Sequence, residues 1–277
     1  SARSEPPAMA RLITSPSNET LKRVRALREK KYRAREGLFL AEGMRIVAEA
    51  IEAGHLPRML IHAEEAAAHP LLQRLVAATE AGGGDVIVTT TDILAKLSGK
   101  DNPQMLLGVF APVARTLADI DRGAAFAWVV CQSLKDPGNL GTILRTCDAV
   151  GAGGVILLDA GCDPYSVEAV RASMGALFTN HIVQAAGGDF FAWLREGPAQ
   201  LVGASLNASM DYQAPRYVAP TFLFMGNEQS GLPPDYEAQC DLLVKIPMRG
   251  RADSLNLAVA AARGEWLVRV DAHSTIP

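Results

Sequence analysis

Apolar and polar residues alternate with short periods along the N-terminal part of the chain. A period of two residues predicts a strand, and a spacing of three to four predicts a helix. The pattern predicts a short apolar run at 38–41 and strands at 58–62, 85–89 and 106–110. It predicts helices at 43–53 and 70–80. Strands that alternate with helices in this way are typical of a compact α/β domain.

The alternation stops at residues 111–123, which include Pro112, and then resumes as a longer series. The predicted strands there are 127–132, 154–158, 181–184, 200–204, 221–225 and 242–246. The predicted helices are 139–150, 164–172, 189–195, 234–239 and 254–270. Apolar strands between helices predict a mostly parallel sheet covered on both faces. Ligands of such sheets bind at the carboxyl ends of the strands, so the loops there are the first place to look for chemistry.

Together these patterns divide the chain into a lead, two α/β domains and a linker. Residues 1–10 are expected to be a disordered lead or a tag, and residues 113–123 a linker. The smaller domain is expected at 11–112 and the larger, parallel-sheet domain at 124–277.

The composition narrows the class of protein further. About half of the 277 residues are apolar (49%), which is ample for two cores, but no window approaches the roughly 20 apolar residues of a membrane span. No secretory signal pattern precedes the first domain, so a cytoplasmic protein is expected. The four cysteines are widely spaced and the five histidines form no ligand spacing, so we expect reduced thiols and no metal.

A net charge of −3 does not suggest a nucleic-acid binder, but one short segment does. Between Lys22 and Arg35 the chain has eight basic residues against the single acid Glu29, a local charge of about +7. Leu21, Val24 and Leu27 give this segment a thin apolar stripe, as in a helix that packs on one side. Charge runs are usually solvated surfaces, yet a patch this dense is also suited to phosphates.

Three loops of the larger domain carry polar residues at strand ends. The first, QSLKDPGNLGTILRTCDAVG, has Asn139 at the start of a predicted helix and Arg145 near its middle. The second, FLFMGNEQSGLP, has Glu228 shortly after Gly226. The third, VKIPMRGRADSLNLAVAAARGEWLV, has Ser254 where it would cap the last helix. Taken singly, each residue is as well explained by a helix cap or a solvated loop.

Taken together, the three loops resemble motifs 1, 2 and 3 of the SpoU (TrmH-like) family of SPOUT methyltransferases. The family pattern is an N-x-G-x-x-x-R helix start, a strand into a G-x-E loop, and I-P-M followed by S-L-N before the last helix. The segment SNETLKRVRALREKKYRAREGLFLAEG resembles the RNA-binding extension of many members, and RASMGALF resembles their intermotif helix start. The fold that the resemblance implies is α/β: a C-terminal parallel-sheet SPOUT domain with a deep trefoil knot, behind an N-terminal ribosomal-protein-like α/β domain.

The resemblance also implies an activity: transfer of a methyl group from S-adenosyl-L-methionine to a ribose 2′-hydroxyl of RNA, by a homodimer. It places Gly226, Ile246 and Leu255 around the cofactor. It makes Arg145 the proposed base, although a free guanidinium normally stays protonated. The remaining polar motif residues, Asn139, Glu228, Ser254 and Asn256, would orient the arginine and the ribose.

The RNA contacts implied by the extension fall on its basic residues, Arg23, Arg25, Arg28, Lys31 and Arg33. Extensions of this kind occur on rRNA-modifying members, so rRNA is favoured over tRNA. The alternatives are a tRNA 2′-O-methyltransferase, an enzyme for one antibiotic-target nucleotide of rRNA, a methyltransferase for protein or a small molecule, and a non-catalytic RNA-binding or ribosome-assembly protein of the same fold.

Overall fold

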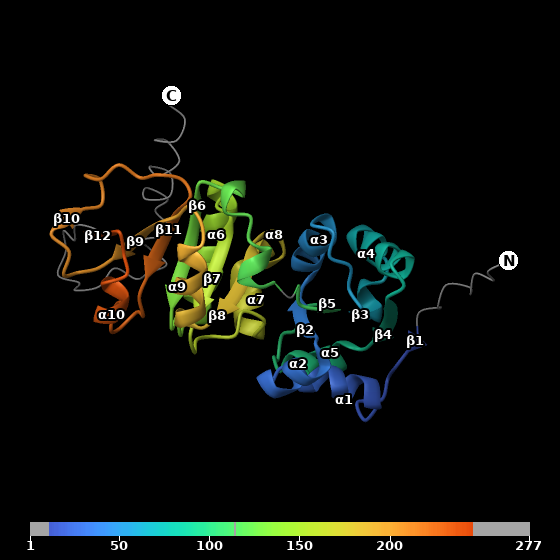
Figure 1. The fold of residues 1–277 in the computed structure, drawn as a ribbon. Helices are drawn as coiled ribbons and strands as arrows, with labels where there is room; N and C mark the ends of the chain where they lie inside the picture. The colour runs from blue at the N-terminus through green and yellow to red at the C-terminus, as the bar shows by residue number, and fades with distance from the viewer. Residues whose placement is uncertain (1–10, 114, 246–277) are drawn as a thin grey trace. The chain divides into compact units, whose positions relative to one another are not determined.

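The computed structural model describes residues 11–113 and 115–245. Within these residues the chain forms a five-stranded sheet and a seven-stranded sheet (Figure 1). The contacts divide the chain into two units. One comprises the residues up to Val113 together with Tyr165–Thr179, and the other comprises the rest of the chain.

The sheet of the first unit has the strand order β1-β4-β3-β5-β2. Its strands are β1 (Arg11–Leu12), β2 (Phe39–Glu42), β3 (Met59–Ala63), β4 (Asp85–Thr89) and β5 (Leu106–Phe110). β1, β4 and β3 pair in parallel, whereas β5 pairs antiparallel with both β3 and β2. The predicted strands of this domain are therefore confirmed, and the apolar run at 38–41 is the strand β2 shifted by one residue.

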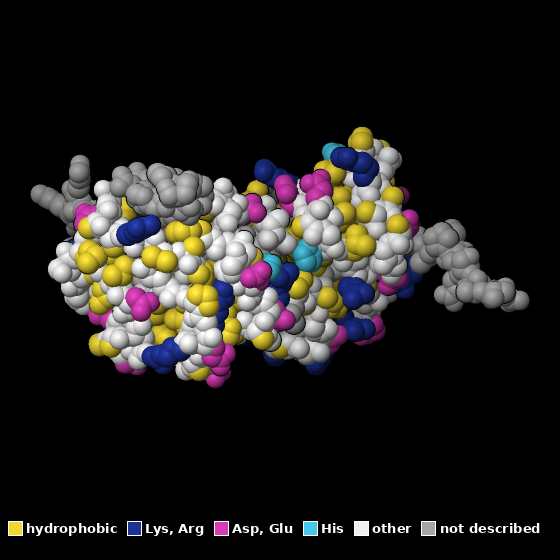
Figure 2. All heavy atoms as spheres, turned by 45° about the horizontal axis from the view of Figure 1, so that its top comes forward, with side chains coloured by type: hydrophobic (Ala, Val, Ile, Leu, Met, Phe, Trp, Pro, Cys, Tyr) yellow, Lys and Arg dark blue, Asp and Glu magenta, His cyan; other side chains and the backbone are white. Residues whose placement is uncertain are grey.

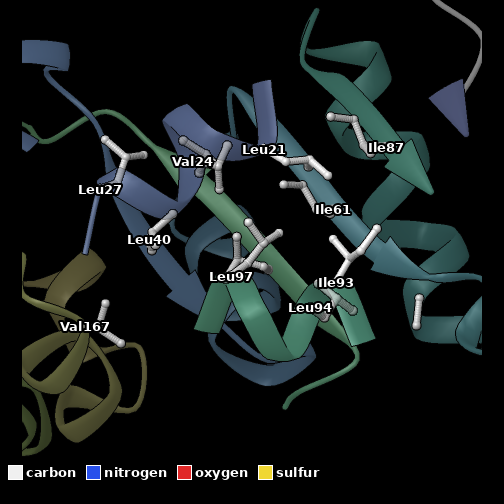
Figure 3. Packing of buried hydrophobic residues seen from close by; sticks show 13 residues of the cluster. Leu21, Val24, Leu27, Leu40, Ile61, Ile87, Ile93, Leu94, Leu97 and Val167 are labelled. Carbon is white, nitrogen blue, oxygen red and sulfur yellow. The ribbon is translucent and has the colours of Figure 1, made fainter. Parts of the chain in front are cut away.

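Helices cover both faces of this sheet. On one side lie α3 (Met44–Glu52) and α4 (Pro70–Ala81), and on the other lie α1 (Glu19–Ala26), α2 (Lys30–Glu36) and α5 (Thr91–Ser98) (Figure 1). The predicted apolar stripe of the basic segment is confirmed, because Leu21, Val24 and Leu27 are all buried against the sheet (Figure 3). A short 3₁₀ helix, η1 (Glu64–Ala66), follows β3.

The basic segment forms two helices where its composition suggested a single helical run. The chain leaves helical geometry between α1 and α2, where Glu29 has extended backbone angles. The guanidinium of Arg33 is buried there, and its Nη1 donates to the carbonyl oxygens of Leu27, at 2.8 Å, and Arg28, at 2.7 Å. These are carbonyls that a continuous helix would satisfy with its own backbone, so Arg33 stabilises the break.

Two helices from the middle of the chain complete the first unit: α7 (Val167–Ser173) and α8 (Ala176–Thr179). Val167 belongs to the same apolar cluster as Leu27 and Leu40 (Figure 3). The ring of Phe178 lies with its centroid 5.0 Å from that of Phe110, and the ring of Tyr165 lies 4.9 Å from that of Phe39. The predicted helix at 164–172 thus exists, starting three residues later, but it packs with the N-terminal sheet.

The sheet of the second unit is parallel throughout, as predicted, with the order β10-β12-β9-β11-β6-β7-β8. Its strands are β6 (Ala127–Gln132), β7 (Gly154–Leu158), β8 (His181–Ala185), β9 (Gln200–Ala204), β10 (Met210–Asp211), β11 (Thr221–Met225) and β12 (Leu242–Lys245). Its helices are α6 (Pro137–Val150), α9 (Gly187–Arg195) and α10 (Pro234–Glu237), with the 3₁₀ helices η2 (Leu117–Asp119) and η3 (Arg122–Ala124).

The core of this second sheet is aromatic. Trp128, Phe190, Phe222 and Phe224 are fully buried in one cluster with apolar residues of β7 and β9. The predicted helix at 254–270 and the segment that would complete a trefoil knot lie outside the described residues. In the part of the chain that the structure describes, no helix is long and apolar enough to cross a membrane.

Candidate active site at the carboxyl ends of β6 and β11

Two of the three motif loops leave neighbouring strands at the same edge of the sheet. β6 and β11 pair in parallel, with Cys131 opposite Met225 at the end of the ladder. The first loop therefore begins at Ser133 beside the second, which begins at Gly226. This edge is where an open parallel sheet binds its ligands.

The loop after β11 is tight, and its shape depends on a glycine. Gly226 is buried, and a Cβ at this position would lie 2.1 Å from the carbonyl carbon of Gly231. The backbones of Asn227 and Gly231 pair by two hydrogen bonds of 3.1 and 2.9 Å. Any side chain at Gly226 would open this turn, so the strand end presents main chain rather than side chains.

The side chain of Asn227 joins this loop to the one after β6. Its Oδ1 accepts from the backbone N–H of Gln229 at 3.0 Å, and its Nδ2 donates to the carbonyl oxygen of Ser133 at 2.9 Å. Ser133 has a φ of 48°, in the left-handed region that non-glycine residues rarely adopt. The bond from Asn227 holds this backbone in place.

Glu228 makes the central connection of the site. Its Oε1 accepts hydrogen bonds from the backbone N–H groups of Lys135 and Asp136, each at 3.2 Å. The side-chain amides of Asn139 and Asn227 donate to the same carboxylate, each over 3.3 Å. A single carboxylate of the second loop is thus bound to the whole turn that leads into α6.

These bonds outweigh the effect of burial on Glu228. Burial acts to raise the pKa of this carboxyl group, but hydrogen bonds from its own backbone N–H, from Asp136 and Lys135, and from Asn139 leave the pKa below its ordinary value. The N-terminus of α6 adds a favourable partial positive charge nearby. Glu228 is therefore a carboxylate at neutral pH and serves as an acceptor.

The start of α6 corrects the sequence interpretation of Asn139. The helix begins at Pro137 rather than at 139, and Asp136 is its N-cap, with Oδ1 accepting from the backbone N–H of Asn139 at 2.6 Å. Proline suits the first helical position because its missing N–H would have no partner there. Asn139 is buried in the first turn, with its side chain directed to Glu228.

Arg145 lies near the middle of α6, as predicted, and its side chain is exposed. Among the described residues it has no hydrogen bond or ion pair. The structure thus brings Asn139 and Glu228 into contact with each other, while Arg145 is separate from that pair.

Sequence reasoning missed Lys135, Asp136 and Asn227 as parts of this site. Lys135 contributes a backbone N–H, which no residue pattern marks. Asp136 could have been found, because aspartate before proline is a common helix start.

The chain matches two family profiles that together span most of its length. Residues 127–263 match the SpoU rRNA methylase family, and residues 18–108 match the MRM3-like substrate binding domain. A 23S rRNA (uridine(2479)-2′-O)-methyltransferase of Streptomyces viridochromogenes is 31% identical over 267 residues, which cover 94% of this chain and 92% of that protein. This chain belongs to the SpoU rRNA methylase family.

Other SpoU relatives match over the same length. A 23S rRNA (guanosine(2553)-2′-O)-methyltransferase of Bacillus subtilis is 28% identical over 90% of this chain and 96% of its own. The AdoMet-bound rRNA methyltransferase from Sinorhizobium meliloti has a TM-score of 0.88 at 37% identity, covering 98% of this chain and 100% of that one. The SpoU methyltransferase AviRb from Streptomyces viridochromogenes, solved with AdoMet, has a TM-score of 0.82 at 29% identity, covering 94% and 100%. AdoMet is S-adenosylmethionine.

Ile246, Ser254, Leu255 and Asn256 lie outside the described residues. Of the cofactor-binding prediction, only Gly226 is described.

The basic residues assigned to RNA in this SpoU chain differ in their surroundings. Arg25 and Arg28 are exposed and have no ion pair with a described residue. Arg23 pairs with Glu36 at 2.7 Å and Lys31 with Glu29 at 3.1 Å, although both cations are exposed. Arg33 is buried on carbonyl oxygens, so its charge serves the local fold.

Cysteine or metal chemistry finds no support in the described part of the chain. All four cysteines are free thiols, and burial raises the pKa of Cys147 to about 12 and that of Cys162 to about 11. Such thiols stay protonated and unreactive at neutral pH. No group of three or more histidine, cysteine, aspartate or glutamate residues there has the arrangement of a metal site.

Proposed function

We propose that this chain transfers a methyl group from S-adenosylmethionine to a ribose 2′-hydroxyl of 23S rRNA. The observation that carries the proposal is the Glu228 carboxylate, which joins the loop after β11 to the start of α6 at the carboxyl edge of the sheet. The relatives named as 23S rRNA 2′-O-methyltransferases match this chain over both of its units.

The cofactor supplies an electrophilic methyl group when bound. In the proposal it lies beside the loop that begins at Gly226, where main-chain groups end the strand, and Ile246 and Leu255 would complete its surroundings. This fits the described edge, because the tight turn at Gly226 keeps bulky side chains out of the strand end.

The residues of this chain would position the ribose and remove its proton. We propose that Arg145 accepts the proton of the 2′-hydroxyl after its guanidinium has lost its own proton with the help of the substrate phosphate and neighbouring polar groups, with Ser254 and Asn256 orienting the ribose. Glu228 and Asn139 act as positioning residues, since they fix the turn that precedes α6. Correct placement of the attacking oxygen accounts for a large part of the rate in such reactions.

The relatives support rRNA over tRNA as the substrate class, but not one base. Their names specify a uridine in one case and a guanosine in another. A contact to ribose and phosphate, with the base identity set elsewhere, is consistent with both. We further propose that the chain acts as a cytoplasmic homodimer, as the family resemblance implies.

Transfer of labelled methyl from S-adenosylmethionine to unmodified 23S rRNA tests the function. After nuclease digestion, the label should appear in one 2′-O-methylnucleoside, whose identity also gives the base. Label in tRNA alone would show that the substrate is tRNA and not rRNA. Cofactor binding without transfer to any RNA would support the non-catalytic alternative. Asn139→Ala is the control, and its cofactor affinity is measured in parallel.

A further inference from the structure

A wide hollow of about 750 Å³ lies within the first unit, formed by parts of the chain that are far apart in sequence. Residues of α1, α2 and α7 and the residues after α5 line it. Its charged lining residues are Lys22, Arg25, Arg28, Glu29, Lys100, Glu168 and Arg171. Cations outnumber carboxylates by five to two, so the hollow attracts anions.

Two of the five cations already pair with a carboxylate of the protein. Lys22 pairs with Glu19 at 2.7 Å. Lys100 pairs with Glu42, whose side chain is almost completely buried. The other three, Arg25, Arg28 and Arg171, have no hydrogen bond or ion pair with any residue that the structure describes. Three guanidinium groups therefore face the hollow with their charge available to a ligand.

Arg28 is held in place by packing rather than by a carboxylate. Gly99 ends α5 with a φ of 66°, and a Cβ at this position would lie 2.0 Å from Nη1 of Arg28. The guanidinium thus lies directly against the backbone of Gly99. Contact of this kind limits where the group can go and leaves its N–H donors open.

Arg171 comes from the helix that the sequence places in the methyltransferase domain. Val167 anchors α7 in the core of the first unit (Figure 3), and Arg171 follows one turn later on the same face of the helix. Because the anchor is buried and the arginine is exposed, α7 forms a fixed wall of the hollow. The intermotif segment therefore adds a cation to the surface of α1 and α2.

We propose that this hollow binds the phosphodiester backbone of the RNA substrate, with Arg25, Arg28 and Arg171 as the phosphate ligands. The inference rests on the proposed function and adds Arg171 and the wall formed by α7 to the RNA-binding surface. Guanidinium groups offer paired N–H donors that match phosphate oxygens, and several unpaired cations across an open hollow fit a polyanion.

The lining favours recognition of the RNA backbone over its bases. Tyr32, the aromatic side chain of the lining, already has the cations of Lys31 and Arg35 at 4.8 Å from its ring centroid. Contacts to phosphate fix the position and orientation of a nucleic acid but carry no direct sequence information. The hollow would thus align the RNA while the choice of nucleotide is made elsewhere.

Filter binding of in vitro transcribed 23S rRNA at several salt concentrations tests the proposal. We expect Arg171→Ala to weaken binding several-fold and to lower the slope of log K against log salt by about 0.7–0.9, the value for one lost phosphate contact. The triple variant with Arg25→Ala and Arg28→Ala should lose about three times as much slope.

Matched controls are Arg45→Ala on α3 and Arg74→Ala on α4, two exposed arginines on the other side of the sheet. Figure 2 shows that basic and acidic side chains are interspersed on the surface on that side of the sheet. Both controls should bind as the wild type does. Thermal unfolding of each variant verifies that the fold is intact.

A wild-type salt slope for Arg171→Ala and for the triple variant would overturn the proposal. Loss of methyl transfer to ribosomal particles by these variants, with unchanged binding of free rRNA, would also overturn the proposal. The hollow would then contact a protein rather than the RNA. Methyl transfer by the wild type is measured in the same preparations. Its absence would refute the proposed function, whereas the salt slopes would still decide the role of the hollow.

Discussion

The loop site around Glu228 and the basic hollow of the first unit use charge in opposite ways. Glu228 is one carboxylate with four donors from other residues around it, two backbone N–H groups and two asparagine side chains. The hollow has three guanidinium groups without an ion pair among the described residues. The charge of Glu228 is bound within the protein and holds two loops together. The charges of the three guanidinium groups remain available to a partner. Changes in the two regions should therefore affect different measurements.

The largest effect is expected at Arg145. Because its side chain is exposed and unpartnered among the described residues, Arg145→Ala should leave stability within about 0.5 kcal/mol of the wild type. If it removes the ribose proton, the variant should lose about 10²–10⁴-fold in kcat with little change in cofactor affinity. Single-turnover methyl transfer and calorimetric titration of the cofactor measure the two quantities. Unchanged turnover would remove Arg145 from the reaction.

Glu228→Gln tests whether the loop connection serves catalysis. The amide keeps one acceptor oxygen, but its NH2 group would face the donors that bind the other oxygen, so we expect the turn before α6 to shift and kcat to fall about 10²-fold. The cost in stability should be about 1–3 kcal/mol. The matched control is Glu196→Gln, an exposed glutamate of the same unit, which should have wild-type turnover. A Glu228→Gln variant with full activity would show that this connection between the loops is not needed for catalysis.

Arg33 is expected to stabilise the fold without binding RNA, in contrast to the arginines of the hollow. Arg33→Ala leaves the carbonyl oxygens of Leu27 and Arg28 without this donor, and we expect a loss of about 1–3 kcal/mol in the free energy of unfolding. The salt slope of rRNA binding should stay as in the wild type at a temperature where the variant is folded. Denaturant titration and filter binding check the two parts. A reduced slope with unchanged stability would return Arg33 to the RNA-binding surface.

Arg23 and Arg25 provide a finer comparison within one helix. Arg23 pairs with Glu36 at 2.7 Å, and Arg25 lines the hollow without a partner among the described residues. Arg25→Ala should weaken rRNA binding several-fold, and Arg23→Ala should weaken it less. Glu36 keeps Arg35 as a partner at 2.8 Å, so neither change should destabilise α1. Equal losses would show that total charge matters more than position.

The smallest expected effect is the change in stability at acid pH. Since the folded pKa of Glu228 is below its ordinary value, the carboxylate contributes stability above that ordinary value and loses it as the pH falls through the lowered one. The difference in Tm between the wild type and Glu228→Gln should thus narrow from about pH 6 to pH 3. A constant difference would indicate that the carboxylate has no favourable bonds in the fold.

The strands and the motif positions could be read from the sequence because they depend on local pattern. Strands β4, β5, β6, β7, β9 and β11 have the predicted bounds, since each is a short apolar run between turn residues. The break between α1 and α2 could not be predicted in this way. It depends on a buried arginine whose partners are carbonyl groups five and six residues earlier.

The site itself was only partly predictable. The resemblance marked Asn139 and Glu228, and they are in contact, but nothing in the residue pattern indicated that backbone N–H groups of Lys135 and Asp136 would be the other partners. The place of Arg171 was also hidden, because the anchor of α7, Val167, looks like any buried residue of the second sheet. Long-range packing of this kind has no signature in a period of two or four residues.

The packing of α7 and α8 on the N-terminal sheet has a consequence for how the chain is made. A ribosome delivers the polypeptide from its N-terminus, and domains commonly fold as they emerge. Here Phe178 packs against the rings of Phe39 and Phe110 but emerges only after β6, α6 and β7 have been synthesised. The first unit therefore finishes folding while the second is already under way, and a fragment that stops at Val113 would leave those rings uncovered.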